Sequence, residues 1–225
     1  MAFSDILNAL TLALNEINTN LPFLFFWLGL ACIILVANFF LANVLFVFGL
    51  LPRHALGLIG IFTSPLVHGN FQHLFMNAIF YLGLGGLVLS QGLDTFISVS
   101  LLIIVISGSL VWVFGRKALH VGASSLIIGY WSFLTVRAIV DPNPTQILGA
   151  IIGMYYFGTH IAASLLSTED NVSIEGHLAG FIAGLITGYF FTDLFDWFTL
   201  YGVDILDAGY NLSNDLNLLV KDLGI

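Results

Sequence analysis

Apolar runs of about 20 residues recur along this chain of 225 residues and constrain its fold more than any other feature. The run from Leu24 to Leu51 and the run from Phe96 to Phe114 contain no charged residue. A helix of about 20 residues spans the hydrocarbon core of a bilayer, so such runs are typical of transmembrane helices. Only 8% of the residues are charged, against about 25% in soluble domains. The sequence therefore predicts an all-α, polytopic membrane protein.

Turn signals divide the apolar sequence into six expected transmembrane helices. The clearest turn is Asp141-Pro-Asn-Pro144, and a Gly-rich loop is expected from Pro52 to Pro65. Six spans would place both termini on the same side of the membrane. The expected spans are residues 24–51, 68–89, 96–114, 124–140, 147–166 and 174–195.

The N-terminal and C-terminal segments are more polar than the apolar central part of the chain. Residues 3–18 place apolar side chains at helical spacing among polar ones, which favours a short amphipathic helix on the membrane surface, ended by a break at Asn20-Leu21-Pro22. Aspartates alternate with leucines near the C-terminus. We therefore expect an N-terminal amphipathic segment (residues 1–20), a six-helix transmembrane domain (21–196) and an acidic tail (197–225).

Charge and cysteine content exclude several classes of function. The formal net charge of −8 argues against nucleic-acid binding, and the single cysteine, Cys32, cannot form a disulfide within the chain. No Lys or Arg precedes Arg53, so the basic start of a secretory signal peptide is missing. The first span is expected to remain as an anchor.

Polar residues within apolar spans are costly and usually mark functional positions. His73 and Asn77 are four residues apart and lie on one helix face, where two hydrogen-bond donors could stabilise an oxyanion. The alternative is that both side chains bond to neighbouring helices. His68 precedes His73 by five residues, a turn of about 140° on a helix, which predicts a separate role for it.

Ser124 lies in Gly122-Ala-Ser-Ser125, where an expected helix begins. Helix N-termini have free N–H groups and partial positive charge, so a serine there has a donor beside it for a developing oxyanion. The alternative role is a helix N-cap. A serine nucleophile also needs a base, because its hydroxyl is weakly nucleophilic by itself.

His177 is the available base, at the start of a helix with glycines at positions 180, 184 and 188. Gly180, Gly184 and Gly188 share one face, which would let this helix approach another closely. The alternative is a hydrogen-bonded interior histidine. Glu175 lies two residues away and should face solvent, which favours a Ser–His dyad over a triad.

Other membrane chemistries fit less well. No His-Glu-x-x-His motif is present, and no aspartate lies in the middle of a span, which argues against zinc and aspartyl proteases. A metal site built from several histidines stays possible, although it would leave Asn77 and the serine turn unexplained. Its candidate ligands are His68, His73, His160 and His177.

Taken together, these motifs resemble those of the rhomboid intramembrane serine proteases. The resemblance covers about residues 50–195 and agrees in order, spacing and placement on the spans. Its motifs are His68-Gly-Asn-Phe-Gln-His73-Leu-Phe-Met-Asn77, Gly122-Ala-Ser124 and Gly176-His177-Leu-Ala-Gly180-Phe-Ile-Ala-Gly184.

The resemblance implies a six-helix core in which Ser124 is the nucleophile and His177 the general base, with no metal or organic cofactor. It implies an oxyanion hole formed by His73, Asn77 and the backbone N–H of Ser124, with His68 holding the neighbouring loop. It also implies cytoplasmic termini and a site that opens to the extracytoplasmic side of the cell membrane. The few Lys and Arg residues favour the opposite orientation, and we follow the resemblance.

Five positions depart from the family pattern. Ser125 stands where a glycine is common, which makes it a rival nucleophile, and Ile59-Gly60 replace a Trp-Arg pair in the first loop. Ile128 replaces an aromatic residue, and Leu89 replaces a glutamate. These departures concern the first loop and substrate preference more than the dyad.

The sequence thus leaves three hypotheses. The first is an intramembrane serine endopeptidase that cleaves transmembrane segments of membrane proteins. The second is a catalytically silent rhomboid-like protein that binds or escorts transmembrane helices. The third is a transporter that binds metal through its histidines.

Overall fold

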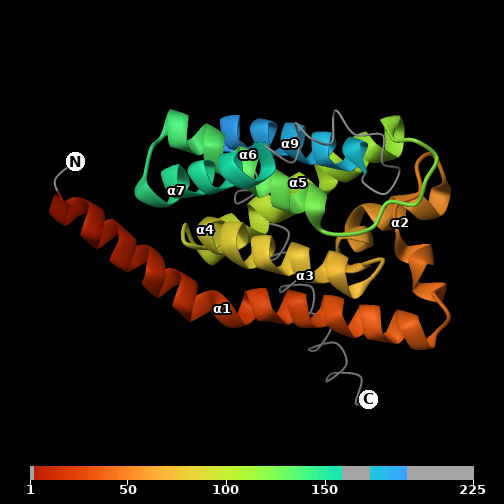
Figure 1. The fold of residues 1–225 in the computed structure, drawn as a ribbon. Coiled ribbons are helices and arrows are strands. Elements are labelled where there is room, and N and C mark those ends of the chain that lie inside the picture. Colours follow the sequence, from red (N-terminus) through yellow and green to blue (C-terminus); the bar gives the residue numbers. More distant parts are fainter. Residues whose placement is uncertain (1–2, 159–172, 192–225) are drawn as a thin grey trace, which may run out of the picture. The chain divides into compact units, whose positions relative to one another are not determined.

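The computed structural model describes residues 3–158 and 173–191, and this part of the chain is helical. Its one β-type contact is an antiparallel bridge between Leu50 and His120. Residues 1–189 form one compact unit, and the structure describes only residues 190 and 191 of the second unit, residues 190–225. The helices (Figure 1) are α1 (Phe3–Phe40), η1 (Val44–Phe48), α2 (Ala55–Thr63), η2 (Ser64–Leu66), α3 (Phe71–Phe80), η3 (Tyr81–Gly85), α4 (Gly86–Leu89), α5 (Leu93–Phe114), α6 (Ser124–Val140), α7 (Pro144–Gly153), η4 (Met154–Gly158) and α9 (Ile174–Tyr189).

Three helical segments in the described part are long and apolar enough to cross a membrane: Ser4–Phe40, Phe71–Leu89 and Leu93–Phe114. Two shorter apolar helical segments are Ala55–Leu66 and Ser124–Val140. Apolar side chains cover much of the surface of these helices, as expected for helices that face lipid. The all-α membrane class is therefore supported, whereas the six-span count stays a prediction.

The expected break before the first span is wrong. α1 runs without interruption from Phe3 to Phe40 with Pro22 inside it, and Figure 1 shows that the helix bends along its length. A proline removes one helical hydrogen bond, but packing can offset that loss. Leu24, two residues later, is fully buried, and the Phe23 ring packs edge-on against Phe96 at 6.0 Å between centroids.

The first span also ends earlier than expected. α1 stops at Phe40 because Ala42 and Asn43 have positive φ angles of 50° and 67°, which end a right-handed helix. The remaining apolar residues form the short helix η1. An apolar run by itself therefore overestimated the length of this helix.

The segment expected to be a loop, Pro52 to Pro65, contains the helix α2. The His54 side chain caps α2 by accepting a hydrogen bond from the backbone N–H of Leu56 at 3.3 Å. A Cβ atom at Gly57 or Gly60 would overlap the backbone of residues 49–51. These glycines therefore serve close helix packing rather than a turn.

The later spans are only partly described. The second expected span consists of α3, a π-helical turn (η3) and α4, and it begins at Phe71 rather than at His68. α7 begins with a capping box at Asn143, and with η4 it accounts for the fifth expected span up to residue 158. The rest of that span, the end of the sixth span and the acidic tail lie outside the described residues.

Helices α6 and α9 pack side by side along a row of glycines (Figure 1). A Cβ at Gly180 would overlap the carbonyl oxygen of Ser125, and one at Gly184 would overlap that of Gly129. A Cβ at Gly188 would lie 3.1 Å from the carbonyl oxygen of Phe133. Both helices advance by four residues per contact, so they are parallel. Their N-terminal turns therefore lie next to each other.

Candidate active site

The loop before α6 is held in place by its backbone. Leu50 and His120 exchange two backbone hydrogen bonds of 2.9 Å, and the N–H of Gly122 donates to the carbonyl of Ser64 at 2.9 Å. Gly122 has a φ of +105°, a conformation that disfavours residues with a Cβ. These hydrogen bonds therefore fix the position of the loop that leads to Ser124.

His73 and Asn77 both lie against Gly122. A Cβ built on Gly122 would be 2.6 Å from Nε2 of His73 and 3.3 Å from Nδ2 of Asn77. The two nitrogens thus converge on the backbone two residues before Ser124, on the side that a glycine leaves open. The structure confirms that this pair shares one helix face.

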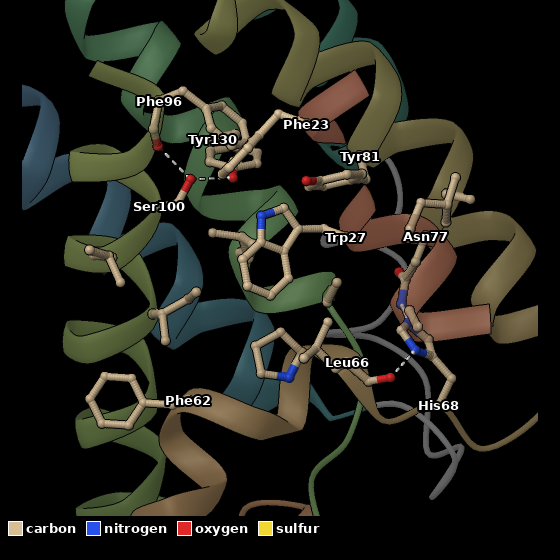
Figure 2. Close-up of a pocket in the computed structure, with 18 of the residues that line it drawn as sticks. Phe23, Trp27, Phe62, Leu66, His68, Asn77, Tyr81, Phe96, Ser100 and Tyr130 are labelled. Carbon is tan, nitrogen blue, oxygen red and sulfur yellow. Dashed lines mark hydrogen bonds between the residues drawn. The ribbon is translucent and has the colours of Figure 1, made fainter. Parts of the chain in front are cut away.

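His68 contacts Asn77, which the helical angle did not predict. His68 lies in the loop before α3, so the 140° rotation of a regular helix does not apply to it. Its Nε2 lies 3.0 Å from Nδ2 of Asn77, and its Nδ1 lies 3.4 Å from the carbonyl oxygen of Leu66 (Figure 2). The carbonyl can only accept, so Nδ1–H donates to it and Nε2 accepts from the Asn77 amide.

Burial keeps the His68 ring neutral. His68 is 2% exposed, and desolvation, with the nearby His73 ring, lowers its pKa from 6.5 to about 4. A protonated ring would donate from both nitrogens and could not accept from Asn77. At neutral pH His68 therefore sets the direction of the Asn77 amide.

Ser124 is the first residue of α6, directly after the N-cap residue Ala123. Its side chain lines a cavity of about 40 Å³, which is large enough for a water molecule. The lining of this cavity is mostly apolar, and its polar members besides Ser124 are Ser64, Ser107, His120, Ser125 and Ser173. The start of α6 thus combines a serine, free helical N–H groups and room for water.

His177 lies in the first turn of α9, beside the first turn of α6. Its neighbours Gly176 and Gly180 contact Ser125: a Cβ at Gly176 would be 3.2 Å from Oγ of Ser125. Ser125 therefore lies in the helix interface. The parallel register brings the turn with His177 next to the turn with Ser124, and the row of glycines allows the close helix approach that the sequence predicted.

No group of three or more His, Cys, Asp or Glu side chains within residues 3–158 and 173–191 has the geometry of a metal site. His160, one of the four histidines considered as ligands, lies outside the described residues.

A family model described as the Rhomboid domain matches residues 55–193, more than half of the chain. The chain belongs to the rhomboid family. It is 34% identical over 137 residues to an uncharacterized protein of Mycobacterium leprae, covering 58% of this chain and 55% of that protein. It is 32% identical over 149 residues to uncharacterized proteins of Mycobacterium bovis and Mycobacterium tuberculosis, covering 63% of this chain and 62% of each relative. The matches thus span less than two thirds of these relatives.

In this rhomboid, two side-chain contacts that the sequence did not reveal join the loop before Ser124 to the start of α9. Nδ1 of His120 lies 2.7 Å from Oγ of Ser173, and Nε2 lies 3.3 Å from the carbonyl oxygen of Arg116. Nε2–H therefore donates to the carbonyl, and Nδ1 accepts from the Ser173 hydroxyl. Ser173 Oγ in turn accepts from the N–H of Gly176 at 3.1 Å.

The second contact is an ion pair, Arg116 Nε to Glu175 Oε1, at 3.5 Å. Glu175 was expected to face solvent, and its side chain is 33% exposed within this ion pair. We call these two contacts, His120–Ser173 and Arg116–Glu175, the loop clasp. The opposite charges of Arg116 and Glu175 were the only sequence signal that could have indicated it.

The first loop of this rhomboid is anchored at Arg53 rather than at Ile59-Gly60. Nη1 of Arg53 donates to the carbonyl of Val113 at 2.8 Å, and the indole N–H of Trp112 donates to the carbonyl of His54 at 3.0 Å. A cation at the C-terminus of α5 is also favoured by the helix dipole. Gly60 meanwhile allows α2 to contact the backbone at Leu50.

Proposed function

We propose that this rhomboid is an intramembrane serine endopeptidase with Ser124 as nucleophile and His177 as general base. The observation that carries the proposal is the convergence of His73 Nε2 and Asn77 Nδ2 on Gly122, two residues before Ser124. This is the arrangement that stabilises negative charge on an oxygen held near Ser124. A protein that only bound helices would not need these donors.

The chemistry would proceed as acyl transfer. Oγ of Ser124 attacks the carbonyl carbon of the scissile peptide while the imidazole of His177 takes the hydroxyl proton. The backbone N–H of Ser124 and the side chains of His73 and Asn77 stabilise the oxyanion. His177 then gives its proton to the leaving amine. A water molecule, with His177 again as base, releases the new carboxylate and restores Ser124.

Three observations support these roles. Ser125 packs against Gly176 within the α6–α9 interface, which favours Ser124 as the reactive serine. His68 orients the amide of Asn77, so that donor needs little rearrangement during the reaction. The cavity of about 40 Å³ beside Ser124, which several hydroxyl groups line, could hold the hydrolytic water.

The substrates would be transmembrane segments of other membrane proteins. A peptide bond in a regular helix is shielded by helical hydrogen bonds, so the segment must unwind near one end before attack. The bilayer is the other partner, and we place the site toward the extracytoplasmic side of the cell membrane. The mechanism needs neither a metal nor an organic cofactor.

Fluorophosphonate labelling tests the proposal. The purified protein should react, Ser125→Ala should still react, and Ser124→Ala and His177→Ala should not. The same set is assayed for cleavage of a model transmembrane substrate. Labelling that persists in Ser124→Ala and is lost in Ser125→Ala would refute the assignment of the nucleophile. A folded protein that neither labels nor cleaves would instead indicate the silent, helix-binding hypothesis.

A further inference from the structure

Basic side chains gather at the C-terminal end of α5. Arg116 and Lys117 follow this helix in the chain, and Arg53 lies in the loop before α2. The backbone N–H of Arg53 donates to the carbonyl of Trp112 at 3.1 Å, and its Nη1 donates to the carbonyl of Val113 at 2.8 Å. Arg53 therefore lies beside the last turn of α5. We call Arg53, Arg116 and Lys117 the basic cluster.

Charge is distributed unevenly between the two ends of α5 and α6. Within the described residues four are Lys or Arg, and three of these form the basic cluster. The fourth, Arg137, lies at the far end of α6, where its Nη2 is 2.9 Å from Oδ2 of Asp141. Asp94 lies in the first turn of α5 and so is also at the far end. Glu175, which pairs with Arg116, is the one acidic residue in the described part of the chain that an ion pair joins to the cluster. The basic cluster therefore has a net positive charge.

Two members of the basic cluster have no acidic partner. Arg116 pairs with Glu175, whereas no ion pair among the described residues involves Arg53 or Lys117. Both of these residues are exposed. A guanidinium has five N–H donors, so Arg53 can bind an anion as well as the carbonyl of Val113. Two cations at this helix end are thus available for an anion from outside the chain.

The position of the basic cluster matches the level of lipid headgroups. α5 has 22 residues and is therefore about 33 Å long, close to the thickness of the hydrocarbon core of a bilayer. Its last two residues, Val113 and Phe114, are 45% and 77% exposed, as expected for side chains that face lipid. An anion that carries apolar chains could contact the cations and these two side chains together. An acidic peptide would match the charge but would leave the apolar side chains uncovered.

We propose that the basic cluster binds the phosphate of an anionic phospholipid. Arg53 and Lys117 contact the phosphate oxygens, because a guanidinium can bind two of them at once and an ammonium adds a compact positive charge. The acyl chains lie along Val113 and Phe114. A basic residue near an anionic membrane surface strengthens binding about fivefold, so two of them should favour an anionic over a zwitterionic lipid by at least about tenfold.

Photo-cross-linking with a labelled lipid tests the proposal. The full-length protein is reconstituted in phosphatidylcholine vesicles that contain a trace of phosphatidylglycerol with a diazirine on its headgroup. After irradiation, the labelled residues are mapped by peptide mass spectrometry, and we expect them at the end of α5 and in the loop that follows it. Unlabelled phosphatidylglycerol should displace the probe at a mole fraction at least about tenfold lower than phosphatidylethanolamine does. Inorganic phosphate in millimolar excess should not displace it, because it lacks acyl chains.

Variants that remove one charge locate the site. Lys117→Gln and Arg53→Gln should each raise the half-displacing mole fraction of phosphatidylglycerol about fivefold. Lys221→Gln removes the same charge near the C-terminus, outside the described residues, and should leave this mole fraction unchanged. Arg116 is kept in all variants, because its loss would also break the loop clasp.

Equal displacement by phosphatidylglycerol and phosphatidylethanolamine, or equal effects of Lys117→Gln and Lys221→Gln, would overturn the site. Displacement by inorganic phosphate would overturn the lipid as the ligand. If Arg53→Gln does not fold, Lys117→Gln still decides, because Lys117 is exposed and makes no ion pair with a described residue.

Cleavage assays separate lipid binding from substrate binding. Lys117→Gln could keep its lipid labelling and yet cleave a substrate with acidic residues beside its transmembrane segment more slowly than a neutral one. In that case the basic cluster binds substrate, and the lipid proposal is wrong.

Discussion

Replacing Gly122 by alanine tests the candidate oxyanion hole directly. Two effects add in this variant. A residue with a Cβ at a φ of +105° costs about 1–2 kcal/mol, and that Cβ would lie 2.6 Å from Nε2 of His73 and 3.3 Å from Nδ2 of Asn77. The contact with His73 is too short for stable packing and the contact with Asn77 is tight, so His73 must move away from the site.

The expected loss of activity follows from that movement. Removing one oxyanion donor typically lowers kcat by about 10²–10³, so Gly122→Ala should lower the cleavage rate by at least about 10². The assay is the initial rate of cleavage of a model transmembrane substrate by purified protein, with thermal unfolding measured in parallel. The unfolding free energy should fall by only about 1–2 kcal/mol.

Gly92→Ala is the matched control. Gly92 has a φ of +110°, but no atom lies within 4 Å of the position of its Cβ. This variant therefore has the same kind of backbone strain without a collision at the site, and it should lose stability while retaining kcat. If Gly122→Ala keeps its kcat within about threefold of the unmodified protein, His73 and Asn77 do not act as oxyanion donors at Gly122.

Three further predictions concern the surroundings of the site. His120→Ala breaks the loop clasp at Ser173, so one hydrogen bond that positions α9 is lost. This variant should lower kcat about tenfold and leave KM unchanged. A larger effect on KM than on kcat would contradict a positioning role for His120. Gly184→Val should lower the unfolding free energy by about 2–3 kcal/mol, because its side chain would overlap α6. Gly83→Ala is the control: no atom lies within 4 Å of the position of its Cβ, so this variant should not destabilise the protein. Equal effects of the two variants would contradict the packed glycine row. The pKa of His68 is lowered from 6.5 to about 4, so between these values the unfolded chain binds one more proton. The unfolding free energy should then fall by about 3 kcal/mol as the pH drops from 6.5 to 4 and stay constant above 6.5. His68→Gln should remove this dependence in thermal unfolding, and an unchanged slope would show that other groups cause it.

Much of the candidate site could be predicted because its residue types are unusual in a membrane span. His73, Asn77, Ser124 and His177 are polar residues in apolar sequence, and helix geometry alone places His73 and Asn77 on one face. The family resemblance combined them with Ser124 and His177. The contacts of His68 could not be predicted in this way. Its position relative to Asn77 depends on where α3 begins, and the periodicity of the sequence did not reveal that boundary.

The loop clasp and the path of α1 illustrate the same limit. His120 and Ser173 are far apart in the sequence, and neither belongs to a motif that indicates a partner. Pro22 is a strong helix-breaking signal, yet α1 continues through it because Phe23 and Leu24 are packed on other helices. Long-range packing decided both outcomes.

The sequence by itself determined the environment of this protein and the residues available for chemistry. Its apolar runs require a membrane, and its few interior polar residues limit the possible sites, because each buried polar group needs a partner or a function. Only the tertiary structure decided which of these residues meet. The parallel contact of α6 and α9 placed the first turns of these two helices side by side, and the left-handed conformation of Gly122 left room for His73 and Asn77 against the backbone before Ser124. Such contacts depend on the shapes of both contacting segments, whereas a sequence pattern describes only one segment at a time.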